Sequence, residues 1–199
     1  HFTQTRLGTV DSFLVLFIML ALYFMYRYII TDKKTINLFL SGLFFSLSIS
    51  VKWTAMLSGL ALAIIYFTNF FKEKYSPKKM FLQGLSFFVV LPLLIYIGIY
   101  LIYPNNRVAY TNSIPEIITL TEKMYDYHST LKSDHYFSSP WYSWPVSYKP
   151  VWYYTKDYSS ATKGTISAFG NILIWWGGII AGCASLFILI IKKDRNIFL

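Results

Sequence analysis

Three charged residues stand where long apolar runs of the sequence begin or are interrupted, and their types suit anion binding. Arg6 and Asp11 lie in HFTQTRLGTVDSF, before the first apolar run, and Lys52 lies in SVKWT, near the middle of the second. Arginine presents a planar fork of donors that suits phosphate, and lysine adds a compact positive charge. Two interpretations stay open at this point. The three side chains form an anion site, or they form a charge network that fixes helix packing.

A second unusual group is aromatic. The segment SSPWYSWPVSYKPVWYY, residues 138–154, holds three Trp, four Tyr and three Pro. Prolines at this spacing prevent a regular helix, because each ring removes an amide donor and clashes with the preceding turn. We therefore expect a loop. Trp and Tyr favour the headgroup zone of a bilayer, and aromatic faces stack on sugars. The loop is thus either an interfacial belt or a sugar-binding surface.

The elements that must position these residues are membrane helices. The chain has 199 residues, of which 55% are hydrophobic and 14% are charged, against about 25% charged in a typical soluble domain. Several apolar runs reach the ~20 residues that cross a bilayer. The net charge of +9 raises nucleic-acid binding as a function. The basic residues, however, gather in short clusters between apolar runs, which is typical of cytoplasmic membrane loops. The composition therefore indicates an integral membrane protein with no nucleic-acid partner.

We expect an all-α fold with about five transmembrane helices. The apolar regions are residues 12–30, 38–71, 81–103 and 169–191. The second region would span roughly 50 Å as one helix, against a ~30 Å hydrocarbon core. We expect it to form two short helices that turn at Lys52, because a lysine at the bilayer centre is costly. The alternative is one long tilted helix from which Lys52 snorkels.

This arrangement divides the chain into three parts and fixes its orientation. Residues 1–103 hold four transmembrane helices, residues 104–168 form an external aromatic loop with a surface helix, and residues 169–199 hold the fifth helix and a basic end. With five spans, the basic clusters share one face, which the positive-inside rule makes cytoplasmic. Arg6, Asp11 and Lys52 then share the external face with residues 104–168. A four-span arrangement would break the rule.

Within the external part, Ile114 to Lys132 has the apolar spacing of an amphipathic helix lying on the membrane. Its carboxylates suit the solvated face of such a helix better than catalytic bases. His128 and His135 are too few for a metal site, so we expect no metal. Pro92 is expected to kink its span. The single cysteine, Cys183, excludes an internal disulfide.

Three segments, taken in order, resemble the protein O-mannosyltransferase family. HFTQTRLGTVDSFLVLF resembles the stretch in which an arginine and an Asp-Ser/Thr pair follow a helix break. GLFFSLSISVKWTAML resembles the family's G-L-A-x-S-x-K-W-T-G segment. The aromatic segment, followed by GNILIWWGG, resembles the pattern S-x-W-W-S-W-P-x-x-x-R-P-x-W-Y-Y … G-N-P-x-x-W-W of bacterial members. The resemblance covers nearly the whole chain.

The resemblance implies a membrane glycosyltransferase of the GT-C class. Such enzymes take mannose, or a related hexose, from a polyprenyl or dolichyl phosphate carrier. They transfer it, with inversion at the sugar carbon, to Ser or Thr of proteins outside the cytoplasm, at the external face of the cell membrane. The implied partners are the lipid-linked donor, an exported protein acceptor and membrane lipid, with no separate cofactor. Pairing with a second copy into a dimer is left open.

The resemblance also assigns residues. Arg6 and Lys52 are expected to bind the carrier phosphate, with Asp11 and Trp53 supporting the site. The residues expected to roof the cavity are Trp141, Trp144, Pro145, Trp152, Tyr153 and Tyr154.

The sequence also departs from the family pattern. The family's catalytic Asp-Glu pair is not in this sequence and is expected upstream of His1. We therefore expect the chain to be a fragment that is inactive alone and has no catalytic residue of its own. Lys149 stands where many relatives have Arg, and Ile172-Leu173 follows an Asn that is often followed by Pro. The large lumenal insert of eukaryotic members is absent, which favours a bacterial or archaeal member.

Two other classes of function remain as alternatives. One is a different GT-C enzyme that modifies a lipid or glycan, which would share the phosphate site and differ in its acceptor. The other is a non-enzymatic transport subunit, which would need polar residues along several spans. The sequence has few of these beyond the serines between Ser41 and Ser50, and small residues more often serve helix packing.

Overall fold

The structure is a computed structural model, and it consists of two compact units. One unit is Gln4–Leu131, and the other combines Lys132–Leu199 with His1–Thr3. Each unit is described by itself. The residues that the structure describes are 8–31, 34–72, 76–102, 113–132, 138–144, 146–149 and 151–192.

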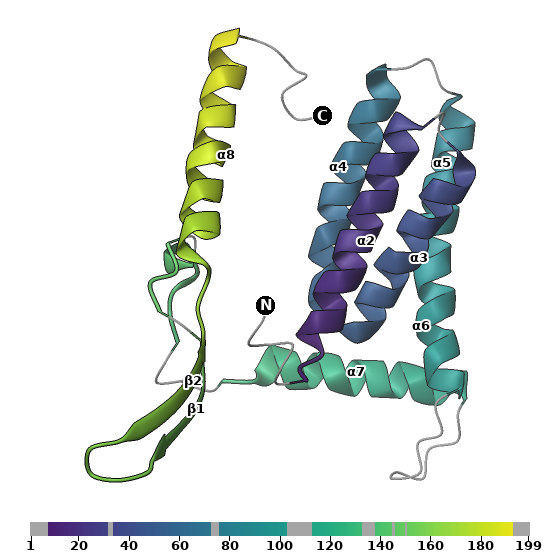
Figure 1. Ribbon diagram of the computed structural model, residues 1–199. Helices are drawn as coiled ribbons and strands as arrows, with labels where there is room; N and C mark the ends of the chain where they lie inside the picture. Colours follow the sequence, from purple (N-terminus) through teal and green to yellow (C-terminus); the bar gives the residue numbers. More distant parts are fainter. Residues whose placement is uncertain are drawn as a thin grey trace. The chain divides into compact units, whose positions relative to one another are not determined.

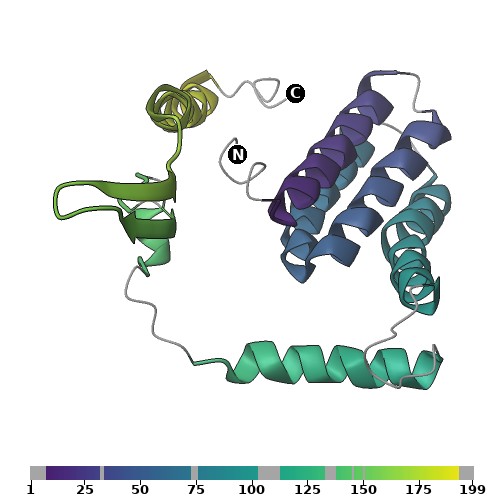
Figure 2. The same ribbon diagram turned by 60° about the horizontal axis from the view of Figure 1, so that its bottom comes forward.

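The first unit is a bundle of antiparallel helices with one helix across its end (Figure 1). Helix α3 lies between α2 and α6, as both views show (Figures 1 and 2). The helices of the bundle are α2 (Asp11–Ile30), α3 (Thr35–Val51), α4 (Met56–Lys72), α5 (Pro77–Leu85) and α6 (Leu91–Ile102). The helix across the end is α7 (Ile114–Thr130).

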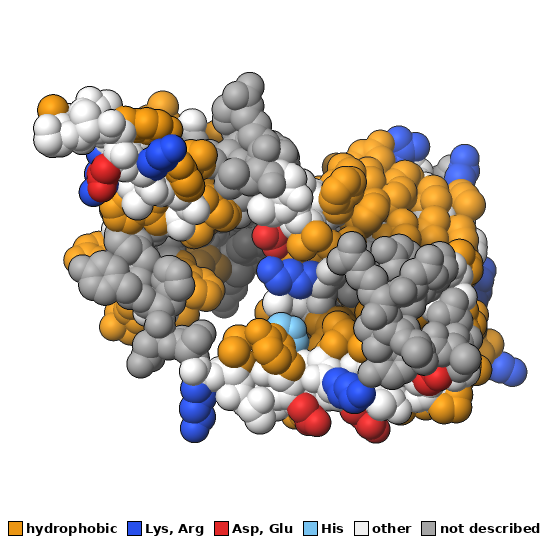
Figure 3. Space-filling model, turned by 90° about the horizontal axis from the view of Figure 1, so that it is seen from below, with side chains coloured by type: hydrophobic (Ala, Val, Ile, Leu, Met, Phe, Trp, Pro, Cys, Tyr) orange, Lys and Arg blue, Asp and Glu red, His pale blue; other side chains and the backbone are white. Residues whose placement is uncertain are grey.

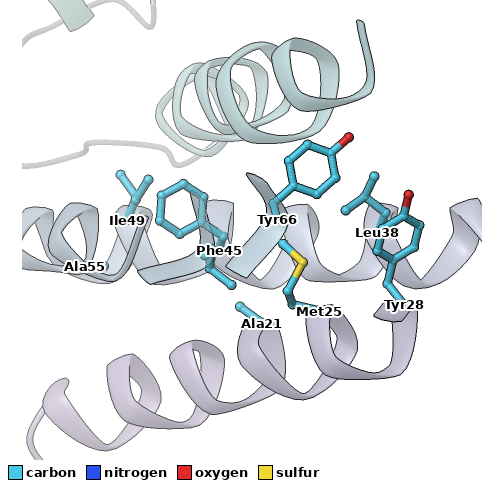
Figure 4. Close-up of a cluster of buried hydrophobic side chains, with 9 residues drawn as sticks. Ala21, Met25, Tyr28, Leu38, Phe45, Ile49, Ala55 and Tyr66 are labelled. Atoms are coloured by element: carbon cyan, nitrogen blue, oxygen red, sulfur yellow. The ribbon is translucent and has the colours of Figure 1, made fainter. Parts of the chain in front are cut away.

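The core of the bundle is a continuous cluster of apolar side chains from α2, α3 and α4 (Figure 4). Met25 from α2, Leu38 from α3 and Leu62 from α4 are almost completely buried. Small residues let the helix backbones approach. Ser41 Oγ of α3 donates a 2.8 Å hydrogen bond to the Ala21 carbonyl of α2. Such small and polar contacts are typical of helix packing in membranes, where lipid is as apolar as the core.

The second apolar region is two helices, as the position of Lys52 predicts. Helix α3 ends at Val51, and Lys52 adopts an extended conformation with φ −160° and ψ 131°. A 3₁₀ turn, η1 (Trp53–Ala55), leads into α4. The chain therefore reverses direction at the lysine (Figure 1), and the single long tilted helix is excluded.

Pro92 lies in α6 directly after a change in helix type, and the kink expected there stays a prediction. The residues just before it, Ser86–Val90, form a π-helical segment, η2, between α5 and α6. A proline has no amide hydrogen to continue the α-helical hydrogen bonds, and a wider turn accommodates the carbonyl groups left behind.

Helix α7 confirms the helix expected at residues 114–132. Ile117 is buried. Thr121 Oγ1 lies 3.4 Å from the Tyr96 hydroxyl. The Tyr100 hydroxyl lies 3.9 Å from the Met124 sulfur. One face of α7 is thus held against α6.

The second unit corrects the all-α prediction, because it contains a β-hairpin. Strands β1 (Val151–Asp157) and β2 (Lys163–Ala168) pair antiparallel, with Val151 opposite Ala168 and Asp157 opposite Lys163. Three residues expected in the loop, Trp152, Tyr153 and Tyr154, therefore lie in a strand. The physical reason is composition: the run Val-Trp-Tyr-Tyr-Thr is made of β-branched and aromatic residues, which favour an extended backbone.

The rest of this unit is helix α8 (Ile172–Lys192) and a short 3₁₀ turn, η3 (Trp141–Ser143). The side chain of Asn171 caps α8, because its Oδ1 accepts hydrogen bonds of 3.1 and 3.2 Å from two amides of the first turn. The prolines do prevent a regular helix around η3.

Among the described residues, two helices are long and apolar enough to cross a bilayer, Asp11–Ile30 and Pro77–Ile102. Three further apolar helices are shorter, at Thr35–Val51, Trp53–Asn69 and Ile172–Ile188. A helix of 17 residues is roughly 26 Å long, a little less than a hydrocarbon core. The helices thus coincide with the five expected spans, while the number that cross the membrane stays a prediction.

Candidate functional site

Two of the charged residues singled out in the sequence meet. Lys52 Nζ lies 3.0 Å from Asp11 Oδ1. Asp11 is the first residue of α2, where the helix dipole favours a negative charge. Lys52 lies in the break between α3 and α4, so the extended backbone there turns its side chain toward the start of α2.

The pair leaves Lys52 able to bind a further group. The lysine side chain is 48% exposed and the aspartate side chain 32%. An ammonium group has three donors, and the aspartate takes one of them. A half-exposed ion pair contributes at most about 1 kcal/mol to stability. The aspartate therefore holds the ammonium group in place more than it stabilises the fold.

A pocket of about 630 Å³ opens beside this pair, within the size range of ligand pockets. Its walls come from the end of α3, the break at Lys52, the end of α6 and one face of α7. The lining residues are Ile49, Ser50, Val51, Lys52, Trp53, Thr54, Tyr100, Met124, Tyr125, His128 and Ser129. Figure 3 shows this end of the unit from below, where acidic, basic and histidine side chains lie near one another.

The pocket brings together Lys52 and Trp53, and Asp11 contacts it through the lysine. Arg6 and Pro145 lie outside the described residues. His128 is a pocket residue that sequence reasoning treated only as a rejected metal ligand. A signal was present, because His128 follows Ile117, Thr121 and Met124 at helical spacing on the face that packs against α6.

The aromatic side chains in the segment 138–154 belong to the second unit, Lys132–Leu199. Trp141 and Trp144 are largely exposed, at 74% and 62%. Trp144 Nε1 donates a 3.3 Å hydrogen bond to the Ser139 carbonyl, and Lys149 Nζ donates one of 3.2 Å to the Ser138 carbonyl. These bonds close a compact turn and leave large aromatic faces free for a partner or for lipid.

A second cavity, of about 350 Å³, lies in the bundle between α3, α4 and the α5–η2 segment. Its walls are apolar and aromatic, with Phe45, Leu62 and Phe88 among them. The Tyr66 hydroxyl at its edge donates to the Met80 carbonyl. No group there suits chemistry, so the pocket at Lys52 is the candidate site. Within the described ranges, no three His, Cys, Asp or Glu side chains gather as metal ligands.

Comparison with known families decides the class of protein. Residues 1–105 match the family described as dolichyl-phosphate-mannose-protein mannosyltransferase, and residues 113–198 match the C-terminal four TMM region of protein-O-mannosyltransferase. The first match alone covers more than half of the 199 residues. The chain belongs to the protein O-mannosyltransferase family. No curated protein and no solved structure matches it.

Membership confirms the family that the three sequence segments indicate. A protein O-mannosyltransferase is a glycosyltransferase, and the family is a membrane family whose donor is dolichyl-phosphate-mannose. The boundary between the two matches, at residues 105–113, falls between α6 and α7. The Lys52 pocket is therefore built from both matched regions of this mannosyltransferase chain.

Proposed function

We propose that this chain supplies the donor-binding end of an enzyme that moves mannose from a polyprenyl phosphate carrier to Ser or Thr of exported proteins. The observation that carries the proposal is the Asp11–Lys52 pair at the edge of a pocket, at one end of an apolar helix bundle. A cation at that position meets the phosphate of a lipid whose tail lies in the bilayer. Lys52, with Arg6, binds this phosphate.

In the reaction, the bond between the sugar C1 and the carrier phosphate oxygen breaks, and a bond from C1 to the acceptor hydroxyl oxygen forms. The carrier leaves as polyprenyl phosphate, on which negative charge develops. A fixed cation stabilises that charge more in the transition state than in the bound donor. The acceptor hydroxyl gives up its proton to a base.

Supporting roles follow from the geometry. Asp11 keeps the Lys52 ammonium group at the pocket edge, and Trp53 provides an apolar wall. The exposed aromatic residues of the other unit, Trp141, Trp144, Trp152 and Tyr154, suit contact with lipid headgroups or with a sugar. The reaction as proposed needs no metal and no cofactor besides the lipid-linked donor.

The orientation in the membrane is part of the proposal. Arg27 lies in the last turn of α2, and Lys78 and Lys79 lie in the first turn of α5. These basic residues are at the other end of the bundle from Asp11 and Lys52, as the antiparallel helices require (Figure 1). The positive-inside rule then places the pocket on the extracytoplasmic face of the cell membrane, with five spans. The sequence between α6 and α8 lacks the large insert of eukaryotic members, which favours a bacterial or archaeal member.

A transfer assay tests the proposal. The complete protein that contains this chain is incubated with radiolabelled polyprenyl phosphate mannose and a Ser/Thr-rich peptide. We expect transfer by the unmodified protein and a loss of at least tenfold in Lys52→Ala, because a charge-assisted hydrogen bond contributes about 1.5–3 kcal/mol. Lys163→Ala is the matched control, since Lys163 forms an exposed 3.3 Å pair with Asp157 on the hairpin.

Each result has one reading. Unchanged transfer in Lys52→Ala would make the Asp11–Lys52 pair a helix-packing contact and would refute the phosphate site. No transfer to peptide by the unmodified protein, with transfer to a lipid or glycan instead, would refute protein as the acceptor. No sugar transfer of any kind would refute the enzyme.

A further inference from the structure

The inner face of α7 changes character along its length. Ile117 is buried, Thr121 meets Tyr96, and Met124 meets Tyr100, so positions 117, 121 and 124 define the face that packs against α6. Residues spaced by three and four lie on the same side of a helix. His128 is the next position on that face. An imidazole there is polar where the stripe before it is mostly apolar.

His128 continues the stripe beyond the end of α6 and therefore reaches the pocket. It lines the same cavity as Lys52, together with Tyr125 and Ser129 of α7. Its ring packs edge-to-face on Tyr127, with the ring centroids 5.3 Å apart. The pocket thus has a cation on the wall formed by the helix break and an imidazole on the wall formed by α7.

We propose that His128 donates a hydrogen bond to the phosphate of the lipid-linked sugar, so that the phosphate lies between Lys52 and α7. This inference rests on the proposed function and adds the residue that holds the phosphate on its second side. Lys52 shares its ammonium group with Asp11 at 3.0 Å, so that one cation is partly neutralised. A further donor, on α7, compensates for this and fixes the direction of the phosphate.

The chemistry favours a phosphate monoester over the diester. The donor is a phosphodiester whose phosphate bears one negative charge. The departing carrier is a phosphate monoester, whose phosphate bears more negative charge. A ring N–H aimed at the phosphate therefore strengthens its hydrogen bond as the C1–O bond breaks. His128 then contributes to binding of the released carrier, and it contributes to the transition state of transfer.

Product inhibition in the complete protein tests this role. A His128 that only packs against its neighbours would not change the inhibition constant of the phosphate relative to that of the alcohol. The probes are a polyprenyl phosphate and the polyprenyl alcohol of the same length, which differs only in lacking the phosphate. We expect His128→Ala to raise the inhibition constant of the phosphate at least about tenfold and to leave that of the alcohol unchanged. His128→Gln, which keeps an N–H donor, should recover part of the loss.

Two further variants guard against a folding effect. His128→Phe keeps an aromatic ring and removes both nitrogen atoms, so it should behave like His128→Ala. Asp126→Asn is the matched control, because Asp126 is an exposed residue of the same helix that does not line the pocket. It should leave both inhibition constants unchanged.

The outcomes separate the inference from the proposed function. Equal losses for the phosphate and the alcohol in His128→Ala and His128→Phe would overturn the inference, because His128 would then only shape the wall. Unchanged constants in both variants would overturn it as well. If the unmodified protein transfers mannose and these results hold, the proposed function stands without His128. If it transfers no sugar at all, there is no transfer to inhibit, and both the proposed function and the inference are overturned.

Discussion

Gly42 lets α3 approach η2 closely, and these two segments lead to α3 and α6 residues that line the Lys52 pocket. A Cβ atom at this position of α3 would lie 2.4 Å from the Phe87 carbonyl oxygen and 2.9 Å from the Phe87 Cβ atom. Phe87 belongs to η2, the π-helical segment that leads into α6. The contact therefore joins the helix that ends beside Lys52 to the helix that carries Tyr100. We predict that Gly42→Ala forces these two helices apart.

The magnitude follows from the geometry. An ordinary Cβ contact begins at about 3.4 Å, so the Phe87 backbone would have to move by about 1 Å. Overpacking costs about 1–3 kcal/mol, and a contact with backbone on both sides belongs at the upper end. Alanine returns about 1 kcal/mol through its higher helix propensity. The net loss of stability is thus about 2 kcal/mol.

Gly98→Ala in α6 is the matched control, because no atom lies within 4 Å of its added Cβ. This variant gains only the higher helix propensity of alanine. It should be as stable as the unmodified protein or up to about 1 kcal/mol more stable. The measurement is the temperature at which half of the protein in detergent leaves the monodisperse peak on size exclusion. Donor affinity should fall in Gly42→Ala alone. Equal melting of the two variants would show that the close approach of α3 to η2 is wrong.

Two further substitutions test contacts in the two units. Ser41→Ala removes the bond to the Ala21 carbonyl and should destabilise the bundle by about 0.6 kcal/mol. Ser185→Ala, which loses only a bond within its own helix, should melt unchanged, and identical melting of the two would contradict an interhelical role for Ser41. Asn171→Ala removes the cap of α8 and should cost about 1 kcal/mol. It should speed hydrogen exchange in the first turn of α8, while Asn171→Ser should not, and unchanged exchange in Asn171→Ala would exclude the cap.

The helix break at Lys52 could be predicted because two constraints agree on it. The apolar region from Leu38 to Phe71 is too long for one crossing, and a lysine in its middle is costly in hydrocarbon. Both point to a turn at the same residue. The meeting of Asp11 with Lys52 follows from the same reasoning, since a chain that reverses there returns its lysine to the end where the first helix starts.

The β-hairpin could not be predicted by the same logic. In a membrane sequence, a run such as Val151 to Thr155 reads equally well as an interfacial aromatic belt. Strand pairing depends on a partner segment, and residues 163–168 carry no strong strand signal because they include Gly164, Ser167 and Ala168. Register between two such segments is set by contacts that a single-sequence reading does not contain.

The role of His128 was missed for a related reason. A metal site is excluded by counting ligands, and that count says nothing about a lone imidazole beside a cation. Its place in the pocket depends on the angle at which α7 crosses the end of α6, which the Tyr96–Thr121 and Tyr100–Met124 contacts fix. The angle at which two helices cross is set by side-chain packing. Hydrophobic periodicity in the sequence shows only which face of a helix is buried.

The Asp11–Lys52 ion pair bears on both interpretations of the charged residues, the anion site and the charge network that fixes helix packing. A partly exposed ion pair contributes little to stability. Helix packing alone therefore gives little reason for a lysine at the end of an apolar helix. A lysine without its aspartate would be free to snorkel in any direction. With Asp11 at the start of α2, its ammonium group has one direction and two spare donors. Packing and anion binding are therefore compatible, because the bond that orients the lysine leaves two of its donors for an anion.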